Sequence, residues 1–203
     1  MSQNVYFGVD LGTTNTKVIA VKESGEFIAS ARRATDWIVL PNGRIEADAD
    51  LLYKKVVDCI NELVTSTAGI LGQFKVAGIG ITGMAESGVI LDKDNKILSQ
   101  PVAWFDSRGE AEMNSLGEEF RKEYQAKTGL VFKPESSLSS LLSMKSEGFD
   151  FKQKGIIWLN LLEYVAFLFT QTKATEPSLA SRTALLDQSN LKFWQRAKDL
   201  LSV

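Results

Sequence analysis

The sequence contains no histidine, one cysteine and four prolines among its 203 residues. Without histidine, the chain lacks both the side chain that most often acts as a general base near neutral pH and the commonest metal ligand. A lone cysteine, Cys59, cannot form a disulfide within the chain, so nothing indicates an oxidising compartment. Acid–base chemistry is therefore expected from carboxylates, and any metal ion is expected to be a hard ion bound through oxygen.

A charge excess and a long hydrophobic run are also missing. The net charge is −2, from 23 basic and 25 acidic side chains, which gives no sign of a nucleic-acid or membrane partner. The most apolar stretch, residues 156–169, is interrupted by Asn160 and Glu163 and is shorter than the roughly 20 residues that a bilayer requires. Residues 1–6 carry no signal-peptide pattern, so we expect a cytoplasmic protein.

Short β-rich runs open the sequence. Residues 5–11, 17–22 and 27–31 are predicted strands, separated by the turn Gly12-Thr13-Thr14-Asn15 and by Ser24-Gly25. Consecutive strands joined by tight turns predict an antiparallel start to the sheet.

Helical patterns become more frequent after these strands. Apolar residues recur at helical spacing over 52–63, where Asp48 or Asp50 can cap the helix, and the apolar run 76–82 suits a strand buried on both faces. The other expected elements are a hairpin around 92–95 and helices over 107–127, 138–145, 158–169 and 191–201. The pattern predicts an α/β fold, a mixed sheet with helices on both faces.

The clearest motif is Gly8-Val9-Asp10-Leu11-Gly12-Thr13-Thr14-Asn15-Thr16-Lys17. An apolar strand carries Asp10 to its end, glycine lets the backbone turn, and hydroxyl and N–H groups can bond phosphate oxygens. Asp10 is the expected catalytic carboxylate and can hold a magnesium ion through water. The predicted phosphate-binding residues are Gly12, Thr13, Thr14, Asn15 and Lys17. An ordinary β-turn is the alternative.

This motif resembles the first phosphate-binding segment of the actin, sugar-kinase and heat-shock chaperone ATPases, which share a ribonuclease H-like fold. Three later segments resemble the FGGY family of carbohydrate kinases: Gly78 to Gly88, the Trp-x-Asp-x-Arg pattern of Trp104 to Arg108, and Ala-Ser-Arg-Thr at Ala180 to Thr183. Order and spacing agree along the whole chain.

The resemblance implies transfer of the ATP γ-phosphate, with Mg²⁺, to a hydroxyl group of a sugar, sugar acid or polyol. The substrate-binding residues that it implies are Ala85, Glu86, Trp104, Asp106, Arg108 and Glu135. Two departures argue against a standard glycerol kinase. The family's Lys-x-x-Trp element falls on Ser140 and Ser143, and the aromatic residue that glycerol kinases offer to substrate is Glu135 here.

The family's proton acceptor lies in a Gly-x-x-Asp turn well after the Ala-Ser-Arg-Thr segment. After Asp187 this chain has only Asp199, in a helical pattern. The resemblance thus implies that residues 1–203 are an incomplete N-terminal FGGY domain, without the base or the adenine-holding lobe and inactive alone. Self-association into a homo-oligomer is a further expectation. The alternatives are a non-catalytic, regulatory nucleotide-binding module of the same superfamily, and a finished protein that only binds.

Other interpretations of single residues remain open. Glu86 could be a solvated residue at the end of a strand, and Trp104 could be core packing. Asp106 and Arg108 could pair with each other or cap the following helix. Residues 181–183 could form only a turn with a helix cap.

Overall fold

The computed structural model describes residues 3–133 and 135–203, which form two compact units. The first unit comprises residues 3–37 and Ala47–Met84, and the second comprises Ile38–Glu46 and Ala85–Val203. None of the helices in the described part of the chain is long and apolar enough to cross a membrane.

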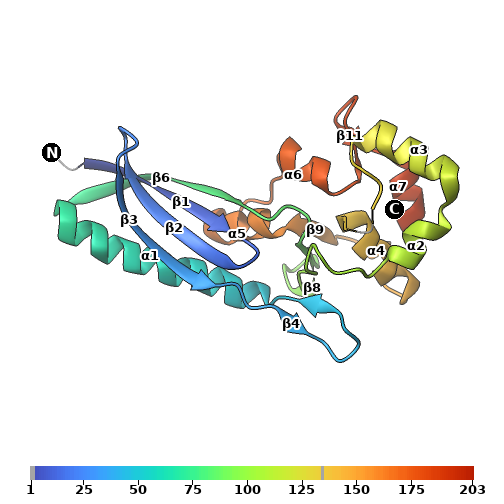
Figure 1. Cartoon of the computed structure of the whole chain (residues 1–203), viewed down its shortest axis with the longest axis horizontal. Coiled ribbons are helices and arrows are strands. Elements are labelled where there is room, and N and C mark those ends of the chain that lie inside the picture. Colours follow the sequence, from blue (N-terminus) through green and yellow to red (C-terminus); the bar gives the residue numbers. More distant parts are fainter. Residues whose placement is uncertain (1–2, 134) are drawn as a thin grey trace. The chain divides into compact units, whose positions relative to one another are not determined.

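A four-stranded mixed sheet forms the centre of the first unit (Figure 1). Its strands are β1 (Gln3–Leu11), β2 (Asn15–Lys22), β3 (Phe27–Ala34) and β6 (Phe74–Gly83), in the order β3-β2-β1-β6. The first three strands are antiparallel, as predicted, and β6 runs parallel to β1. Alternate side chains of β1 are buried, from Val5 to Leu11, so one face of the sheet forms the core.

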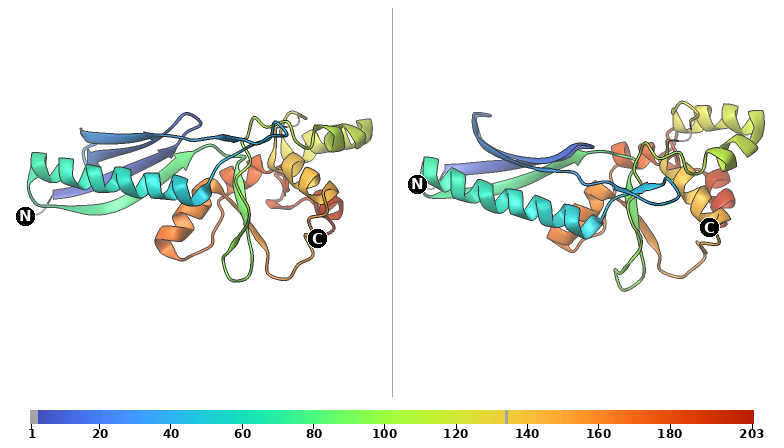
Figure 2. Two further views of the ribbon diagram at one scale, coloured as in Figure 1. Left: turned by 90° about the horizontal axis from the view of Figure 1, so that it is seen from below. Right: turned by 60° about the horizontal axis from the view of Figure 1, so that its bottom comes forward.

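Helix α1 (Ala49–Leu71) lies along that face (Figure 2). The Asp48 carboxylate accepts a hydrogen bond from the backbone N–H of Leu51 at 2.8 Å, so Asp48 rather than Asp50 is the N-cap. Leu52, Val56 and Cys59 are among the buried residues of the helix. The predicted helix and its apolar side are confirmed, and Cys59 is part of the core.

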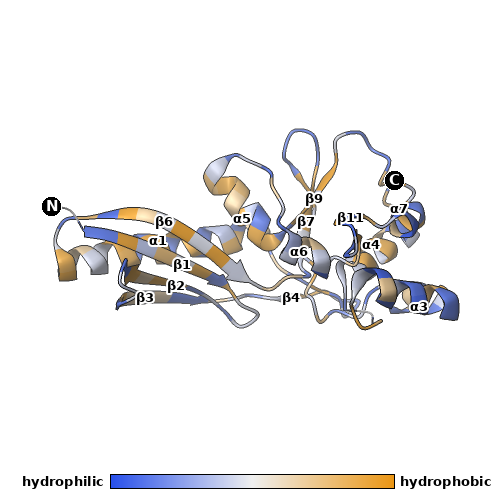
Figure 3. Ribbon diagram, turned by 90° about the horizontal axis from the view of Figure 1, so that it is seen from above, coloured by the Kyte–Doolittle hydropathy of each residue, from blue (hydrophilic) through white to orange (hydrophobic). Residues whose placement is uncertain are grey.

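The position of β6 differs from the prediction. The strand forms, but it lies at the outer edge of the sheet, and most of its side chains are exposed rather than buried on both faces. Val76 is 36% exposed and Ile79 is 42% exposed, although the strand is largely hydrophobic (Figure 3). An apolar run identifies a strand but cannot tell an edge strand from a central one. Among the described residues of this unit, the single helix α1 covers one face of the sheet.

The second unit contains two small antiparallel sheets near its start. Strands β4 (Ile38–Val39) and β5 (Ile45–Glu46) form a hairpin. The other sheet has the order β8-β7-β9, made of β7 (Gly88–Leu91), β8 (Ile97–Ser99) and β9 (Ile157–Asn160). The predicted hairpin at residues 92–95 joins β7 to β8 and is confirmed.

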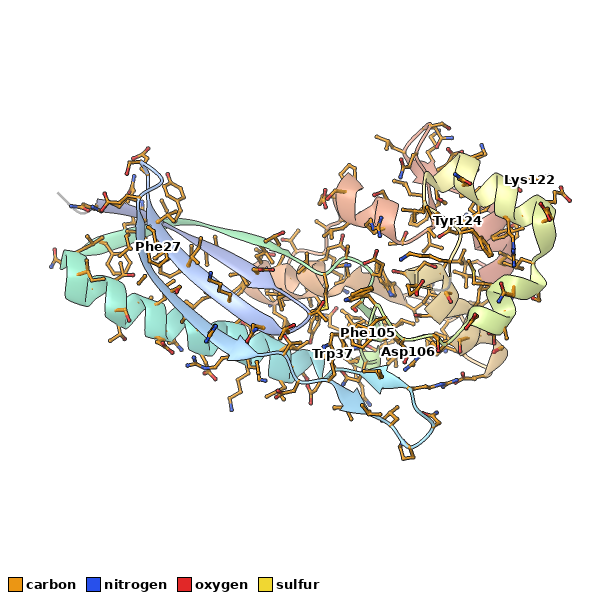
Figure 4. All side chains as sticks on the ribbon, in the orientation of Figure 1. Phe27, Trp37, Phe105, Asp106, Lys122 and Tyr124 are labelled. Carbon is orange, nitrogen blue, oxygen red and sulfur yellow. The ribbon has the colours of Figure 1, made fainter. Side chains whose placement is uncertain are left out.

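Six helices and a two-stranded ribbon complete the described part of this unit. They are α2 (Glu110–Ser115), α3 (Gly117–Thr128), α4 (Ser137–Ser146), α5 (Leu161–Thr170), α6 (Pro177–Arg182) and α7 (Gln195–Leu201), with β10 (Leu186–Asp187) paired to β11 (Lys192–Phe193). Tyr124 of α3 (labelled in Figure 4) and Phe120 are fully buried beside Trp194. The Phe120 and Trp194 rings stack with their centroids 5.2 Å apart. Aromatic packing therefore holds α3 and α7 together.

Three predicted helices have different boundaries. The helix expected from Ser107 begins at Glu110 and is divided at Gly117, whose φ is 78°, before ending at Gly129 as predicted. The helix expected from Leu191 begins at Gln195, because Lys192–Phe193 pairs with Leu186–Asp187 as a strand.

The helix expected from Trp158 begins at Leu161 instead. Residues 157–160 form β9 against β7, and Asn160 then caps α5 through a hydrogen bond from the N–H of Leu162 at 3.0 Å. The Glu163 carboxylate accepts from the Asn160 N–H at 2.9 Å, which completes a capping box. The capping residue therefore sets the start of the helix within a continuous apolar run.

Candidate functional site

The predicted phosphate turn connects β1 to β2 in the first unit. The N–H of Gly12 donates to the carbonyl of Asn15 at 3.1 Å, which closes the turn tightly. A β-carbon on Gly12 would lie 2.9 Å from that same carbonyl oxygen, so a side chain at this position would force the turn to shift. The glycine is required by the close approach of the backbone.

A segment after β3 holds the carbonyl groups of this turn. The Thr35 hydroxyl donates to the carbonyl of Gly12 at 2.8 Å, and its N–H donates to the carbonyl of Thr14 at 2.9 Å. The indole N–H of Trp37, labelled in Figure 4, donates to the carbonyl of Thr13 at 2.8 Å. All peptide bonds in the described residues are trans. Because a trans peptide points its C=O and N–H in opposite directions, the N–H groups that follow these carbonyls face away from the 35–37 segment. The carbonyl groups of the turn are therefore held on the side of the 35–37 segment, and the N–H groups that follow them lie on the other side.

Asp10 and Lys17 flank the turn. They are directly paired across β1 and β2, so their side chains share one face of the sheet, and both are exposed. Among the described residues neither side chain makes an ion pair or a hydrogen bond, although many of the other charged groups do. A carboxylate and an ammonium group without protein partners are both available to a ligand.

An open cleft of about 440 Å³ lies over these two residues, lined also by Gly8, Gly80 and Thr82. The glycines leave space beside the carboxylate of Asp10. Within the described residues no group of three carboxylate, cysteine or histidine ligands gathers. A single exposed carboxylate fits a hydrated magnesium ion, which keeps most of its waters and takes one or two carboxylates.

Glu86 follows β6 and belongs to the second unit. Its carboxylate is paired with Arg182 of α6: the guanidinium Nε lies 2.8 Å from Oε1, and Nη2 contacts the same oxygen. The Glu86 side chain is only 13% exposed. The structure does not support the alternative of a solvated residue at a strand end.

Asp106 and Arg108 form a buried ion cluster with Glu46. Arg108 donates to both carboxylate oxygens of Asp106 at 3.0 Å and to Glu46 Oε1 at 2.7 Å, while the N–H of Ile45 donates to Asp106 at 2.6 Å. The side chains of Asp106 and Arg108 are 3% and 5% exposed. They pair with each other, as one of the alternatives proposed, whereas the cap of α2 is Gly109, which has no side-chain hydrogen bond to offer.

The environment of Asp106 affects its titration. Burial by itself would raise the pKa of this carboxyl group, but hydrogen bonds from the Arg108 side chain and from backbone N–H groups outweigh burial and lower the pKa below its ordinary value. Its ion pair and hydrogen bonds therefore favour the ionised form of Asp106 in the loop before α2.

Trp104 and Glu135 lie at the surface of the second unit. Trp104 is 37% exposed and packs edge-to-face on Phe105, with ring centroids 5.5 Å apart, so it is not a core residue. Glu135 lies 3.8 Å from the Lys133 ammonium group. Among the described residues no hydrogen bond or ion pair joins Glu135 to Glu86. Their roles toward a substrate stay predictions.

Comparison with known proteins decides the family. The profile of the FGGY family of carbohydrate kinases, N-terminal domain, matches residues 5–203. The chain belongs to this family. It is 28% identical to a glycerol kinase of Aquifex aeolicus, with 94% of this chain and 39% of that protein aligned. It is 30% identical to a glycerol kinase of Acinetobacter baylyi, with 96% of this chain and 40% of that protein aligned.

A solved structure agrees with this assignment. The crystal structure of gluconate kinase from Lactobacillus acidophilus superposes with a TM-score of 0.90 and 25% identity, covering 100% of this chain and 40% of that one. The FGGY chain therefore spans about two fifths of the length of these relatives. It has the predicted ribonuclease H-like fold of the sugar-kinase ATPases, and membership of the FGGY family does not favour the alternative of a non-catalytic module.

The sequence motifs contain the charged residues of the candidate site but not the residues that contact them. Thr35 and Trp37 carry no local motif, and nothing in the sequence links them to the phosphate turn. Arg182 lies in the Ala-Ser-Arg-Thr segment, so the family resemblance pointed to it, although a turn with a helix cap explained it equally well. Glu46 completes the Arg108 cluster from 62 residues away in the sequence.

Proposed function

We propose that the complete gene product transfers the γ-phosphate of ATP to a hydroxyl group of a sugar, sugar acid or polyol. One observation carries this proposal: in a chain of the FGGY family, Asp10 and Lys17 lie exposed and without protein partners in the cleft beside the phosphate turn. Opposite charges placed beside directed N–H groups suit a polyphosphate bound with a cation.

The phosphate turn would hold the nucleotide. N–H and hydroxyl groups of Gly12, Thr13, Thr14 and Asn15 would bond phosphate oxygens, and Lys17 would neutralise part of their charge. Asp10 would hold Mg²⁺ through water, and the bound ion supplies positive charge that offsets the charge of the phosphate oxygens.

The second unit would bind the acceptor. Glu86 would accept hydrogen bonds from substrate hydroxyl groups, because a carboxylate can take two adjacent hydroxyls. Asp106 and Arg108 are held in their own cluster and would support the pocket rather than contact the substrate. Trp104, exposed beside Phe105, would offer a ring face to the apolar side of a sugar, and Ala85 and Glu135 would line the pocket.

Residues 1–203 by themselves are expected to bind Mg·ATP weakly and to phosphorylate no sugar. Asp10 and Lys17 lie in a cleft open to water, and phosphoryl transfer depends on closing the site around both substrates. Calorimetric titration of Mg·ATP into this chain and into the complete gene product would compare their affinities for the nucleotide.

The acceptor is identified by measuring ADP release from the complete gene product with polyols, aldonates and ketoses. We expect one class to raise ADP release well above the rate without acceptor. Equal rates with and without every acceptor would contradict the proposed function.

A further inference from the structure

The loop that carries Glu86 is fixed at its backbone from two other segments. The Ser137 hydroxyl, at the start of α4, donates to the carbonyl of Glu86 at 2.8 Å. The Asn160 amide, at the end of β9, donates to the carbonyl of Ala85, and the N–H of Leu161 donates to the carbonyl of Ser87 at 2.9 Å. Three consecutive carbonyl groups are thus engaged, so the backbone has little freedom, and only the side-chain torsions of Glu86 remain to be set.

Arg182 sets those torsions. Both of its contacting nitrogens, Nε and Nη2, reach one carboxylate oxygen, Oε1. Among the described residues no hydrogen bond reaches the other oxygen, Oε2. The contact therefore fixes the position of Oε1 and leaves the other carboxylate oxygen able to accept from a ligand hydroxyl.

Arg182 is itself held in place from α4. It is the last residue of α6, and the carbonyl of the next residue, Thr183, accepts a hydrogen bond from the N–H of Leu138 at 3.0 Å. The Thr183 hydroxyl donates to the carbonyl of Ala180 at 2.7 Å and stabilises the helix end. The same short stretch of α4, Ser137 and Leu138, thus anchors both Glu86 and the helix end that carries Arg182.

The contact is poorly suited to a purely stabilising role. The Arg182 side chain is 43% exposed while the Glu86 side chain is 13% exposed, so the ion pair is half-open to water and contributes less to folding than a fully buried pair. Its geometry is specific, however, because only a guanidinium group offers two donors in a fixed planar fork. Lysine would keep the charge and lose the fork.

We propose that Arg182 is a positioning residue that orients Glu86 toward the hydroxyl groups of the acceptor. This inference rests on the proposed function. Arg182 acts through Glu86, so its removal should cost activity only while Glu86 is present.

The test uses the complete gene product and its Arg182→Ala, Arg182→Lys, Glu86→Ala and double variants. Arg196→Ala is the matched control, because Arg196 pairs with Glu123 in the same unit at a similar exposure of 38%. We expect Arg182→Ala to lower kcat/KM by about 10- to 100-fold and to have no further effect in the Glu86→Ala background. Arg182→Lys should recover part of the loss, and Arg196→Ala should leave kcat/KM unchanged. The melting temperatures of Arg182→Ala and Arg196→Ala should be similar.

Three results would overturn the inference: an Arg182→Ala enzyme as active as the Arg196→Ala control, additive losses in the double variant, or a loss matched by a fall in melting temperature. If the wild-type protein phosphorylates no acceptor, the proposed function fails, and a crystal structure of Arg182→Ala then decides the inference separately. A displaced or multiply oriented Glu86 carboxylate supports the positioning role, and an unchanged carboxylate contradicts it.

Discussion

Lys17 lies in the cleft beside the predicted phosphate turn and has no protein partner among the described residues. Lys22, five residues later on the same strand, is instead paired with Glu26 at 2.9 Å. The two lysines therefore separate the effect of a ligand-binding charge from that of a surface ion pair.

Replacing Lys17 with Met should weaken Mg·ATP binding by the complete gene product. A hydrogen bond to a charged group is worth about 1.5–3 kcal/mol, which corresponds to about a 10- to 150-fold rise in Kd. Calorimetric titration checks this, with Lys22→Met as the control that should bind like the wild type. Equal affinity of the two variants for Mg·ATP would show that Lys17 does not bind the phosphate groups.

Asp106 belongs to a buried ion cluster, so replacing it should lower the free energy of unfolding by a large amount. Changing it to Ala would leave the buried Arg108 guanidinium with Glu46 alone, which should destabilise the protein by about 3 kcal/mol. The exposed pair of Lys93 and Asp94 is the contrast, and Asp94→Ala should cost less than about 1 kcal/mol. Denaturant unfolding measures the free energy of unfolding of both variants. A similar loss of stability in the two would contradict the structural role of the buried cluster.

The lowered pKa of Asp106 adds a pH dependence. A carboxyl group with a depressed folded-state pKa stabilises the fold fully above its unfolded pKa of about 3.9 and loses that contribution as the pH falls through the folded value. The melting-temperature gap between wild type and Asp106→Asn should thus be constant above about pH 5 and shrink below about pH 4. A melting-temperature gap that widens as the pH falls would mean that folding raises the pKa of Asp106.

At the scale of elements, the β1–β2 hairpin depends on the segment that follows β3. Thr35 is buried, and its hydroxyl donates to the carbonyl of Gly12, so it links the end of β3 to the predicted phosphate turn. We expect the N–H groups of the β1–β2 turn to donate to phosphate, and the 35–37 segment to hold those N–H groups in place.

Thr35→Val keeps the side-chain shape and removes that hydrogen bond. We expect a loss of about 1 kcal/mol in the free energy of unfolding and severalfold weaker Mg·ATP binding. Thr65→Val is the control, because the Thr65 hydroxyl bonds only within α1, to the carbonyl of Asn61 at 3.1 Å. If the two variants bind the nucleotide equally well, the 35–37 segment does not shape the phosphate site.

Local patterns predicted elements where one signal was unambiguous. The antiparallel hairpins followed from turn residues, and the start of α1 followed from an acidic cap before an apolar periodicity. Residues 158–160 were misassigned to a helix, because a short apolar run fits a strand equally well until its pairing with β7 is known. Side-chain partners were missed for a similar reason, since Arg182 and Glu86 are 96 residues apart.

At the scale of the whole molecule, the phosphate turn belongs to the first compact unit and Glu86 belongs to the second. The FGGY assignment spans both units, from residue 5 to residue 203. Four motifs in the right order were enough to predict the family and the fold, whereas Glu135, which stands where glycerol kinases have an aromatic residue, leaves the identity of the acceptor a proposal.

The central claim is that the cleft at Asp10 serves phosphoryl transfer to a sugar-like hydroxyl group. The direct measurement is acceptor-dependent ADP release by the complete gene product and by its Asp10→Asn variant, with Asp58→Asn on the exposed side of α1 as the control. We expect acceptor-dependent release by the wild type and the control, and a fall of about 100-fold or more in Asp10→Asn. Release that needs no acceptor, or that survives in Asp10→Asn, would contradict the account.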